Sequence, residues 1–161
     1  MSTWGSGRLQ DSLHMLHIDR MPGQAQLKFF GMSIYTARLW VGSGFSPDQC
    51  ATEPLILDIE YARKLEGALI AERSMIEMRR IGAFDQQSVG WFEFMTRCFP
   101  NVAAGDRLTG VYDGVSQLSF YFNHEFVGML DDALFAHLFI GIWLHPNTSA
   151  PALRAQLLGQ V

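Results

Sequence analysis

The alternation of apolar and polar side chains predicts two long strands in the first half of the chain. From Gln26 to Val41 the sequence is rich in β-branched and aromatic residues with a period of two, and a run of glycine and serine over 42–44 ends it. A polar loop follows, and the same period returns from Leu55 to Arg63. These two segments are the first expected strands.

One face of the first expected strand combines a positive charge with apolar side chains. Successive residues of a strand point to opposite faces, so the even-numbered positions from 30 to 40 share one face. They are Phe30, Met32, Ile34, Thr36, Arg38 and Trp40. A guanidinium without a partner on such a surface is costly. We therefore expect an anion at Arg38, either a ligand carboxylate held by the planar fork of donors or an internal acid from Asp58, Glu60 or Glu72.

The second expected strand repeats this arrangement. Leu55, Leu57, Ile59, Tyr61 and Arg63 share one face, whereas two acids take the other. Tyr61 and Arg63 therefore join Arg38 and Trp40 as candidate ligand-binding residues.

The remaining pattern predicts helices and a small meander. The elements expected are helices over 64–80, 85–99, from 131 or 132 to 139, and 151–158, and strands over 106–112, 117–122 and 125–129. Asp85, Asp131 or Asp132, and Thr148 or Ser149 are suited to cap helices. Because the strands are grouped instead of alternating with helices, we expect an α+β domain with an antiparallel sheet covered by helices.

Composition limits the classes of function. A chain of 161 residues with 48% hydrophobic content fits one domain, expected over 25–161, with a partly ordered N-terminal segment over 1–24 that contains a short strand and a turn. No apolar run is long enough to cross a bilayer. The net charge of −4 and the absence of a basic patch argue against nucleic acid as a partner.

Cysteine and histidine suggest no metal or redox chemistry. Cys50 and Cys98 form no C-x-x-C motif; buried thiols are one interpretation, and a single bridge in an exported protein is the other. His14 and His17 have a spacing that a metal could use, but they lie in the N-terminal segment that we expect to be only partly ordered. We expect no metal and no cofactor.

Several segments, taken in order, resemble the chalcone isomerase-like superfamily, in particular its bacterial members. The segments that carry the resemblance are FGMSIYTARLWV over 30–41, LDIEYAR over 57–63, IAERS over 70–74, EMRR over 77–80, GDRLTGVY over 105–112, FIGIWL over 139–144 and SAPALR over 149–154. The resemblance implies a large curled antiparallel sheet packed against a layer of helices, with a ligand cleft between the two layers.

The resemblance does not imply isomerase activity. In the plant enzymes a threonine, a tyrosine, an asparagine and a late hydroxyl surround the flavonoid, and these positions align near Phe30, Glu66, Arg73 and Leu138. None of these four residues has the functional group that the plant enzymes have at that position. Ring closure of a chalcone needs hydrogen-bond donors at the ketone oxygen, where negative charge develops. We therefore expect no catalytic residue.

The plant branch that binds fatty acids is the better functional analogue. In that branch an arginine and a tyrosine hold the carboxylate, but the arginine aligns near Ile56 here. A carboxylate site in this chain would therefore have to use residues at other positions. Arg73, which keeps a motif position, could serve the cleft or only pair with Glu66 and Glu77 along its helix. Tyr35 could offer a hydroxyl at the cleft mouth or find a local partner.

The leading hypothesis is a non-catalytic protein whose cleft binds a fatty acid or a flavonoid-like amphipathic anion, with Arg38 or Arg63 at the head group. One alternative is an isomerase or lyase acting on a chalcone-like enone, with Tyr61 as proton donor and Arg38 polarising the carbonyl. Another is a structural or chaperone-like module without a ligand. We expect a periplasmic or secreted protein if an export signal has been removed, and a cytoplasmic one otherwise.

Overall fold

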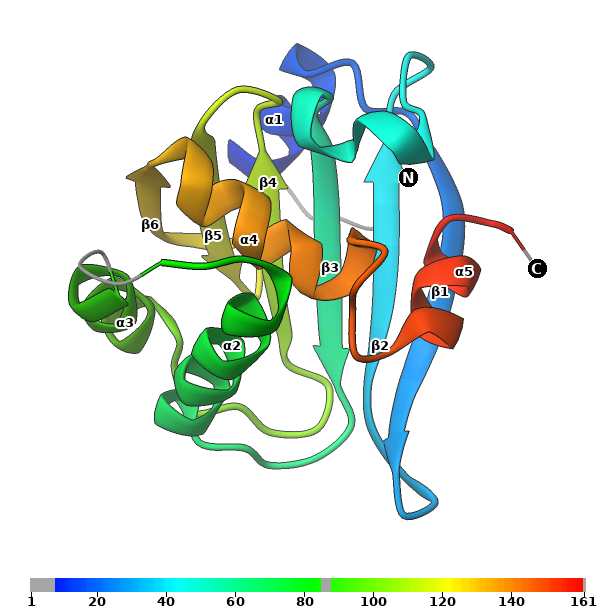
Figure 1. Cartoon of the computed structure of the whole chain (residues 1–161). Helices are drawn as coiled ribbons and strands as arrows, with labels where there is room; N and C mark the ends of the chain where they lie inside the picture. Colours follow the sequence, from blue (N-terminus) through cyan, green and yellow to red (C-terminus); the bar gives the residue numbers. More distant parts are fainter. Residues whose placement is uncertain (1–7, 85–87, 161) are drawn as a thin grey trace.

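The computed structural model describes residues 8–84 and 88–160 and contains one six-stranded antiparallel sheet (Figure 1). The strands are β1 (Arg20–Phe29), β2 (Met32–Val41), β3 (Leu55–Tyr61), β4 (Arg107–Tyr112), β5 (Gln117–Phe122) and β6 (Glu125–Asp131). Their order in the sheet is their order in the sequence, so every strand pairs with the next one. The expected α+β class with an antiparallel sheet is confirmed.

Helices lie over both faces of this sheet, most of them over one face. They are α1 (Arg8–Met15), the 3-10 helix η1 (Pro47–Thr52), α2 (Gly67–Ile81), α3 (Ser88–Cys98), α4 (Ala133–Leu144) and α5 (Pro151–Leu157). Figure 1 shows α2, α3 and α4 as a layer in front of the sheet, α5 over β1, and α1 behind the sheet. The predicted helices are all present, although Asp85, the expected cap of α3, lies outside the described residues. The expected cap of α5 at Thr148 or Ser149 is wrong, because Ala150 holds the N-cap position and no side chain caps this helix.

The expectation of one long strand over 26–41 is wrong, because a two-residue turn divides it into β1 and β2. Phe29 pairs with Met32, and the turn between them has positive φ at Phe30 (51°) and Gly31 (78°). Phenylalanine rarely adopts this left-handed conformation, which glycine and asparagine favour. The sequence therefore lacks the usual signal of a hairpin at this point.

Helix α1 was not expected within the N-terminal segment. It places Leu9 and, after the helix, Ile18 on the outer face of the sheet, where they pack with Ile56, Val111 and Tyr121 in a small second apolar cluster. The outer face is thus partly covered.

The main core lies between the sheet and the layer of helices. Phe120 of β5 contacts the rings of Phe99 and Phe139, each with ring centroids 5.1 Å away. Asp132 caps α4 by accepting a hydrogen bond from the Phe135 amide at 3.1 Å, and it also accepts one from Trp91 Nε1 at 2.9 Å. The expected start of this helix is confirmed, and the same carboxylate ties α3 to α4.

Candidate functional site

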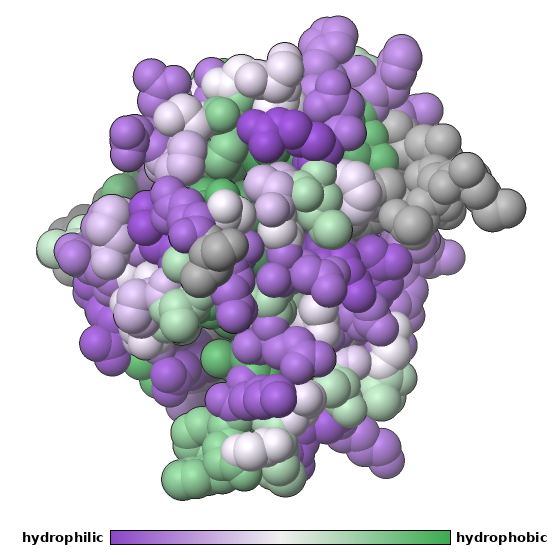
Figure 2. Space-filling view, turned by 90° about the vertical axis from the view of Figure 1, so that its right-hand side faces the viewer, coloured by the Kyte–Doolittle hydropathy of each residue, from purple (hydrophilic) through white to green (hydrophobic). Residues whose placement is uncertain are grey.

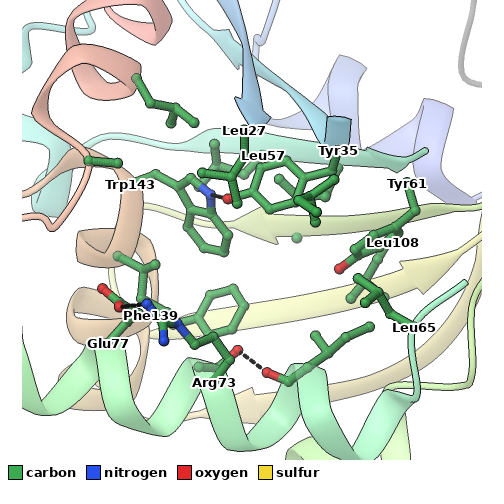
Figure 3. A pocket seen from close by; sticks show the side chains of 18 of the residues that line it. Leu27, Tyr35, Leu57, Tyr61, Leu65, Arg73, Glu77, Leu108, Phe139 and Trp143 are labelled. Carbon is green, nitrogen blue, oxygen red and sulfur yellow. Dashed lines mark hydrogen bonds and ion pairs between the residues drawn. The ribbon is translucent and has the colours of Figure 1, made fainter. Parts of the chain in front are cut away.

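A cavity of about 350 Å³ lies between the sheet and helices α2, α4 and α5 (Figure 3). Its walls are mostly apolar. It is lined by Leu27, Ile34, Tyr35, Leu57, Ile59, Tyr61, Leu65, Leu69, Ile70, Arg73, Ser74, Glu77, Leu108, Gly110, Phe120, Phe139, Ile142, Trp143, Ser149, Ala150 and Leu153. Ligand sites in proteins are commonly about 300–1,000 Å³ and apolar with a few polar groups, so this cavity has the size and character of a small-molecule site.

Tyr61 presents a hydroxyl to this cavity. The residue is only 5% exposed, and no hydrogen bond is formed by its hydroxyl within the described part of the chain. Figure 3 shows the hydroxyl directed toward the interior of the cavity. Burial raises the pKa of Tyr61, so the group stays protonated and is available as a donor.

Tyr35 lies beside Tyr61 and is already engaged. The two residues are register partners in β2 and β3, and their ring centroids are 6.1 Å apart. Trp143 Nε1 donates a hydrogen bond to the Tyr35 oxygen at 3.0 Å. Burial raises the pKa of Tyr35 to about 12, with the Trp143 bond acting in the opposite direction. The hydroxyl of Tyr35 therefore has a partner within the protein, which is one of the two expected alternatives. The residue also lines the cavity.

Arg73, Glu77 and Ser149 form a polar wall of the cavity. The Arg73 side chain is 69% exposed, whereas Glu77 is buried, and Arg73 Nη2 lies 2.8 Å from Glu77 Oε1. Ser149 Oγ donates a hydrogen bond to Glu77 Oε2 at 2.7 Å, and Arg80 Nε lies 3.7 Å from the same oxygen. The arginine therefore lies where the cavity meets solvent, and the internal ion pair expected along the helix is present.

The expectation that Arg38 faces the cleft is wrong. Arg38 lies on the outer face, where Nη1 is 2.9 Å from Glu60 Oε1 and 3.6 Å from Asp58 Oδ2, and Nε donates to Gln24 Oε1 at 3.3 Å. From residue 35 to residue 41 the inner face of β2 is formed instead by the odd-numbered positions, of which Ala37 is fully buried. The alternative of an internal acid at Arg38 is confirmed.

Trp40 and Arg63 also lie away from the cavity. Trp40 shares the outer face with Arg38 and packs against the cluster under α1. Arg63 follows the end of β3, is exposed, and donates from Nη1 to Met32 Sδ at 3.5 Å. Of the six candidate residues, the cavity contains Tyr35, Tyr61 and Arg73.

Four polar residues of the cavity were not among the candidates: Ser74, Glu77, Trp143 and Ser149. Glu77 carried a signal, because it is an acid four residues after Arg73 and close to the apolar stripe of α2. Trp143 and Ser149 occur in two of the segments that carry the family resemblance, but nothing in their spacing connects them to a site.

Other candidate chemistry is not assembled in the described structure. Cys50 and Cys98 are both free, which supports the interpretation as thiols, and burial raises the pKa of each. Residues 8–84 and 88–160 contain no group of three or more metal-ligating side chains. Within the same residues, no helix is long and apolar enough to span a bilayer.

The fold and the cavity together define the class: an open antiparallel sheet of the chalcone isomerase-like type, with a layer of helices enclosing a ligand-sized space. The structure of a fatty-acid binding protein from Arabidopsis thaliana is similar, with a TM-score of 0.67 over 87% of this chain and 86% of that chain. Their sequences are 10% identical, so the likeness shows the fold. A protein of Haemophilus influenzae described as uncharacterized is 29% identical over 139 residues, which are 86% of this chain and 67% of that protein. No protein-family profile matches the chain.

Proposed function

We propose that the protein binds a small amphipathic ligand with a single alkyl chain, such as a fatty acid, without transforming it. The observation that carries this proposal is the Tyr61 hydroxyl, which belongs to a residue only 5% exposed, is protonated, forms no hydrogen bond within the described structure and is directed into an apolar cavity. A ligand oxygen at this hydroxyl would gain a hydrogen bond that the protein itself does not supply, and such a bond contributes about 0.5–1.5 kcal/mol. The similar Arabidopsis structure, a fatty-acid binding protein, supports the same kind of ligand.

The polar groups suggest how such a ligand would lie. Arg73 uses Nη2 for Glu77, and a guanidinium has further donors in its planar fork for a carboxylate at the rim of the cavity. The alkyl chain would then extend over Leu57, Ile59 and Leu108. Each buried methylene contributes about 0.8 kcal/mol, so affinity is expected to rise with chain length until the cavity is full.

Displacement of a fluorescent fatty acid by unlabelled fatty acids of increasing chain length tests this proposal. Tyr61→Phe is expected to weaken binding about fivefold because one hydrogen bond is lost. Arg73→Gln is expected to weaken binding of the carboxylate but not of the matching fatty alcohol. Arg63→Gln is the matched control, because this arginine is exposed and lies outside the cavity.

Two results would contradict the proposal. One is the absence of displacement at any chain length together with no lipid retained in native mass spectrometry of the purified protein. The other is equal affinity of the wild type, Tyr61→Phe and Arg73→Gln, which would place the fatty acid outside the cavity.

A second candidate function is an isomerase or lyase acting on a chalcone-like enone. It is supported by the presence of a protonated Tyr61 and the Arg73–Glu77 pair around one apolar space. In this proposal Tyr61 donates the proton and Arg73 takes the carbonyl-polarising role first assigned to Arg38. Loss of chalcone absorbance faster than spontaneous cyclisation, abolished by Tyr61→Phe, would favour it over simple binding.

A further inference from the structure

The hairpin of β1 and β2 presents an apolar tip to solvent. Phe29 is 62% exposed, Phe30 89% and Met32 50%. Pairing of β2 with β3 ends at Tyr35, so Met32 and Ser33 have their strand partners in β1. Figure 1 shows this hairpin projecting past the other strands at the lower end of the molecule, and Figure 2 shows an apolar patch at that end.

The turn at this tip is not optimised for stability. Phe30 has a φ of 51°, and its ring lies against that of Phe29 with centroids 4.5 Å apart instead of packing on the body of the protein. Asparagine would fit the same backbone with less strain. A bulky apolar residue that is both strained and exposed is consistent with selection for a contact outside the chain.

Basic side chains surround the tip. Lys28 is exposed within the hairpin, Arg63 donates to Met32 Sδ at 3.5 Å, and Lys64 is the next residue in the chain and also exposed. The nearest acid along that loop, Glu66, is at the start of α2. A chain with a net charge of −4 therefore carries a local group of cations beside the most exposed aromatic residues of its described part.

The rim of the cavity adjoins this end. Leu27 and Ile34 belong to the hairpin strands and line the cavity together with Leu69 of α2, which is exposed. The Ala62 amide donates to the Ile34 carbonyl at 2.9 Å and so holds the basic loop against the hairpin. Figure 2, viewed toward the β1 edge, shows a hollow with hydrophobic atoms inside it just above the apolar patch.

We propose that this end of the molecule docks on the surface of a bilayer that contains anionic phospholipid. Phe29 and Phe30 enter the interfacial region, and Lys28, Arg63 and Lys64 contact the lipid phosphates. The cavity rim then faces the membrane, from which a single-chain lipid could enter. Docking itself does not depend on the function proposed above.

The size of the tip favours a membrane over a protein partner. Two phenylalanines bury at most about 500 Å² together. A stable protein interface buries about 800 Å² on each partner. An interfacial anchor needs only a few aromatic residues with cations beside them, which is what the tip provides.

Vesicle flotation of the full chain tests the proposal. We expect flotation with vesicles of phosphatidylcholine mixed with phosphatidylglycerol, weaker flotation with phosphatidylcholine alone, and release by salt, because surface charge attraction is screened. No flotation with the mixed vesicles at low salt would overturn the proposal.

Variants separate the tip from the rest of the surface. Phe30→Asn is expected to raise or preserve the thermal midpoint, because asparagine fits the turn, and to lower vesicle affinity at least about tenfold. Lys28→Glu with Arg63→Glu is expected to lower affinity for the mixed vesicles about fivefold per cation. Val115→Asn is the matched control, since Val115 is 70% exposed in the turn after β4, at the opposite end of the sheet.

Two further outcomes overturn the proposal. Vesicle affinity of Phe30→Asn equal to that of the wild type would exclude the tip as the anchor. A dimer in sedimentation equilibrium that Phe30→Asn dissociates would assign the tip to a contact between copies. Fatty-acid displacement without vesicles reports on the cavity alone, so a failure of docking and a failure of ligand binding are distinguishable.

Discussion

Asp58 is a fully buried carboxylate on the outer face of the sheet, away from the cavity. It accepts hydrogen bonds from Arg107 Nη2 at 2.5 Å and from Thr109 Oγ1 at 2.9 Å, and Arg38 lies 3.6 Å away. Periodicity correctly grouped Arg38 with Thr36 and Trp40 but could not indicate which face is internal, because both faces of β2 carry apolar residues. Arg38, which suggested an anionic ligand, is therefore part of an ion-pair network within the protein.

Removal of the Asp58 carboxylate is expected to cost more than removal of its neighbour. Asp58→Ala leaves the adjoining arginines without their buried counter-charge and should lower the free energy of unfolding by about 3–5 kcal/mol. Glu60→Ala removes a partly exposed partner of Arg38 and should cost about 0–1 kcal/mol. Urea unfolding of the two variants checks this; equal losses would contradict a central role for Asp58.

The tyrosines of the cavity predict a loss of stability at alkaline pH. The pKa of Tyr35 rises from 10.0 to about 12 on folding, so the unfolded chain loses this proton first and unfolding is favoured as pH increases through that interval. The slope for one such group is about 1.4 kcal/mol per pH unit. Tyr35→Phe should therefore show a flatter decline than the wild type in unfolding measured across this range. A decline of unchanged slope would mean that Tyr35 ionises without constraint.

At the scale of the element, helix α2 begins at a glycine because its backbone lies very close to another segment of the chain. The helical pattern predicts a start at Lys64, but Leu65 forms a β-bridge with Val102, and the helix begins at Gly67. A Cβ at Gly67 would lie 1.9 Å from the carbonyl oxygen of Phe99. The Gly67 amide donates to Asn101 Oδ1 at 2.9 Å. This contact positions the helix that carries Arg73 and Glu77.

Gly67→Ala is accordingly expected to destabilise the protein although alanine is the better helix former. Relief of the clash requires backbone movement, for which a loss of about 1–3 kcal/mol is expected. Gly90→Ala, on an exposed turn of α3 where the added Cβ meets no atom within 4 Å beyond the backbone of its own helix and its chain neighbours, is the matched control and should be neutral or stabilising. Thermal unfolding of both variants distinguishes a packing effect from a helix-propensity effect.

The elements themselves were largely predictable and their junctions were not. Strands β3 to β6 and helices α2 to α5 follow from period and from caps such as Asp132. The turn at Phe30 was missed because it uses a residue that turns avoid, and α1 was missed because eight residues with few apolar positions carry little periodic signal. Both failures occur where the local residue types carry no signal of the backbone that forms.

At the scale of the molecule, the cavity combines segments that are far apart in the sequence. Leu27, Tyr61, Phe120 and Leu153 all contribute to its lining. Sequence patterns placed Tyr61 on the inner face of its strand, but no pattern indicates that an interior remains incompletely filled. The size of the space and its polar wall were therefore not predictable.

Ligand in this interior should stabilise the folded state by mass action. At a free ligand concentration of about 100 Kd the expected gain is about 2.7 kcal/mol, seen as a higher thermal midpoint. The shift should grow with fatty-acid chain length and shrink in Tyr61→Phe at the same concentration. Differential scanning fluorimetry measures it, and a shift produced equally by an alkyl sulfonate and by inorganic sulfate would indicate a non-specific ionic effect.

The packing of α5 on β1 also constrains how the molecule is assembled. A Cβ at Gly23 of β1 would lie 1.9 Å from the Gln156 carbonyl oxygen, and α5 brings Leu153 to the cavity. More than a hundred residues separate β1 and α5 in the sequence. During synthesis on the ribosome, β1 therefore cannot pack against α5 until α5 has emerged. A nascent chain arrested before α5 should therefore expose both the sheet edge and the apolar interior, and be sensitive to protease and to chaperone capture.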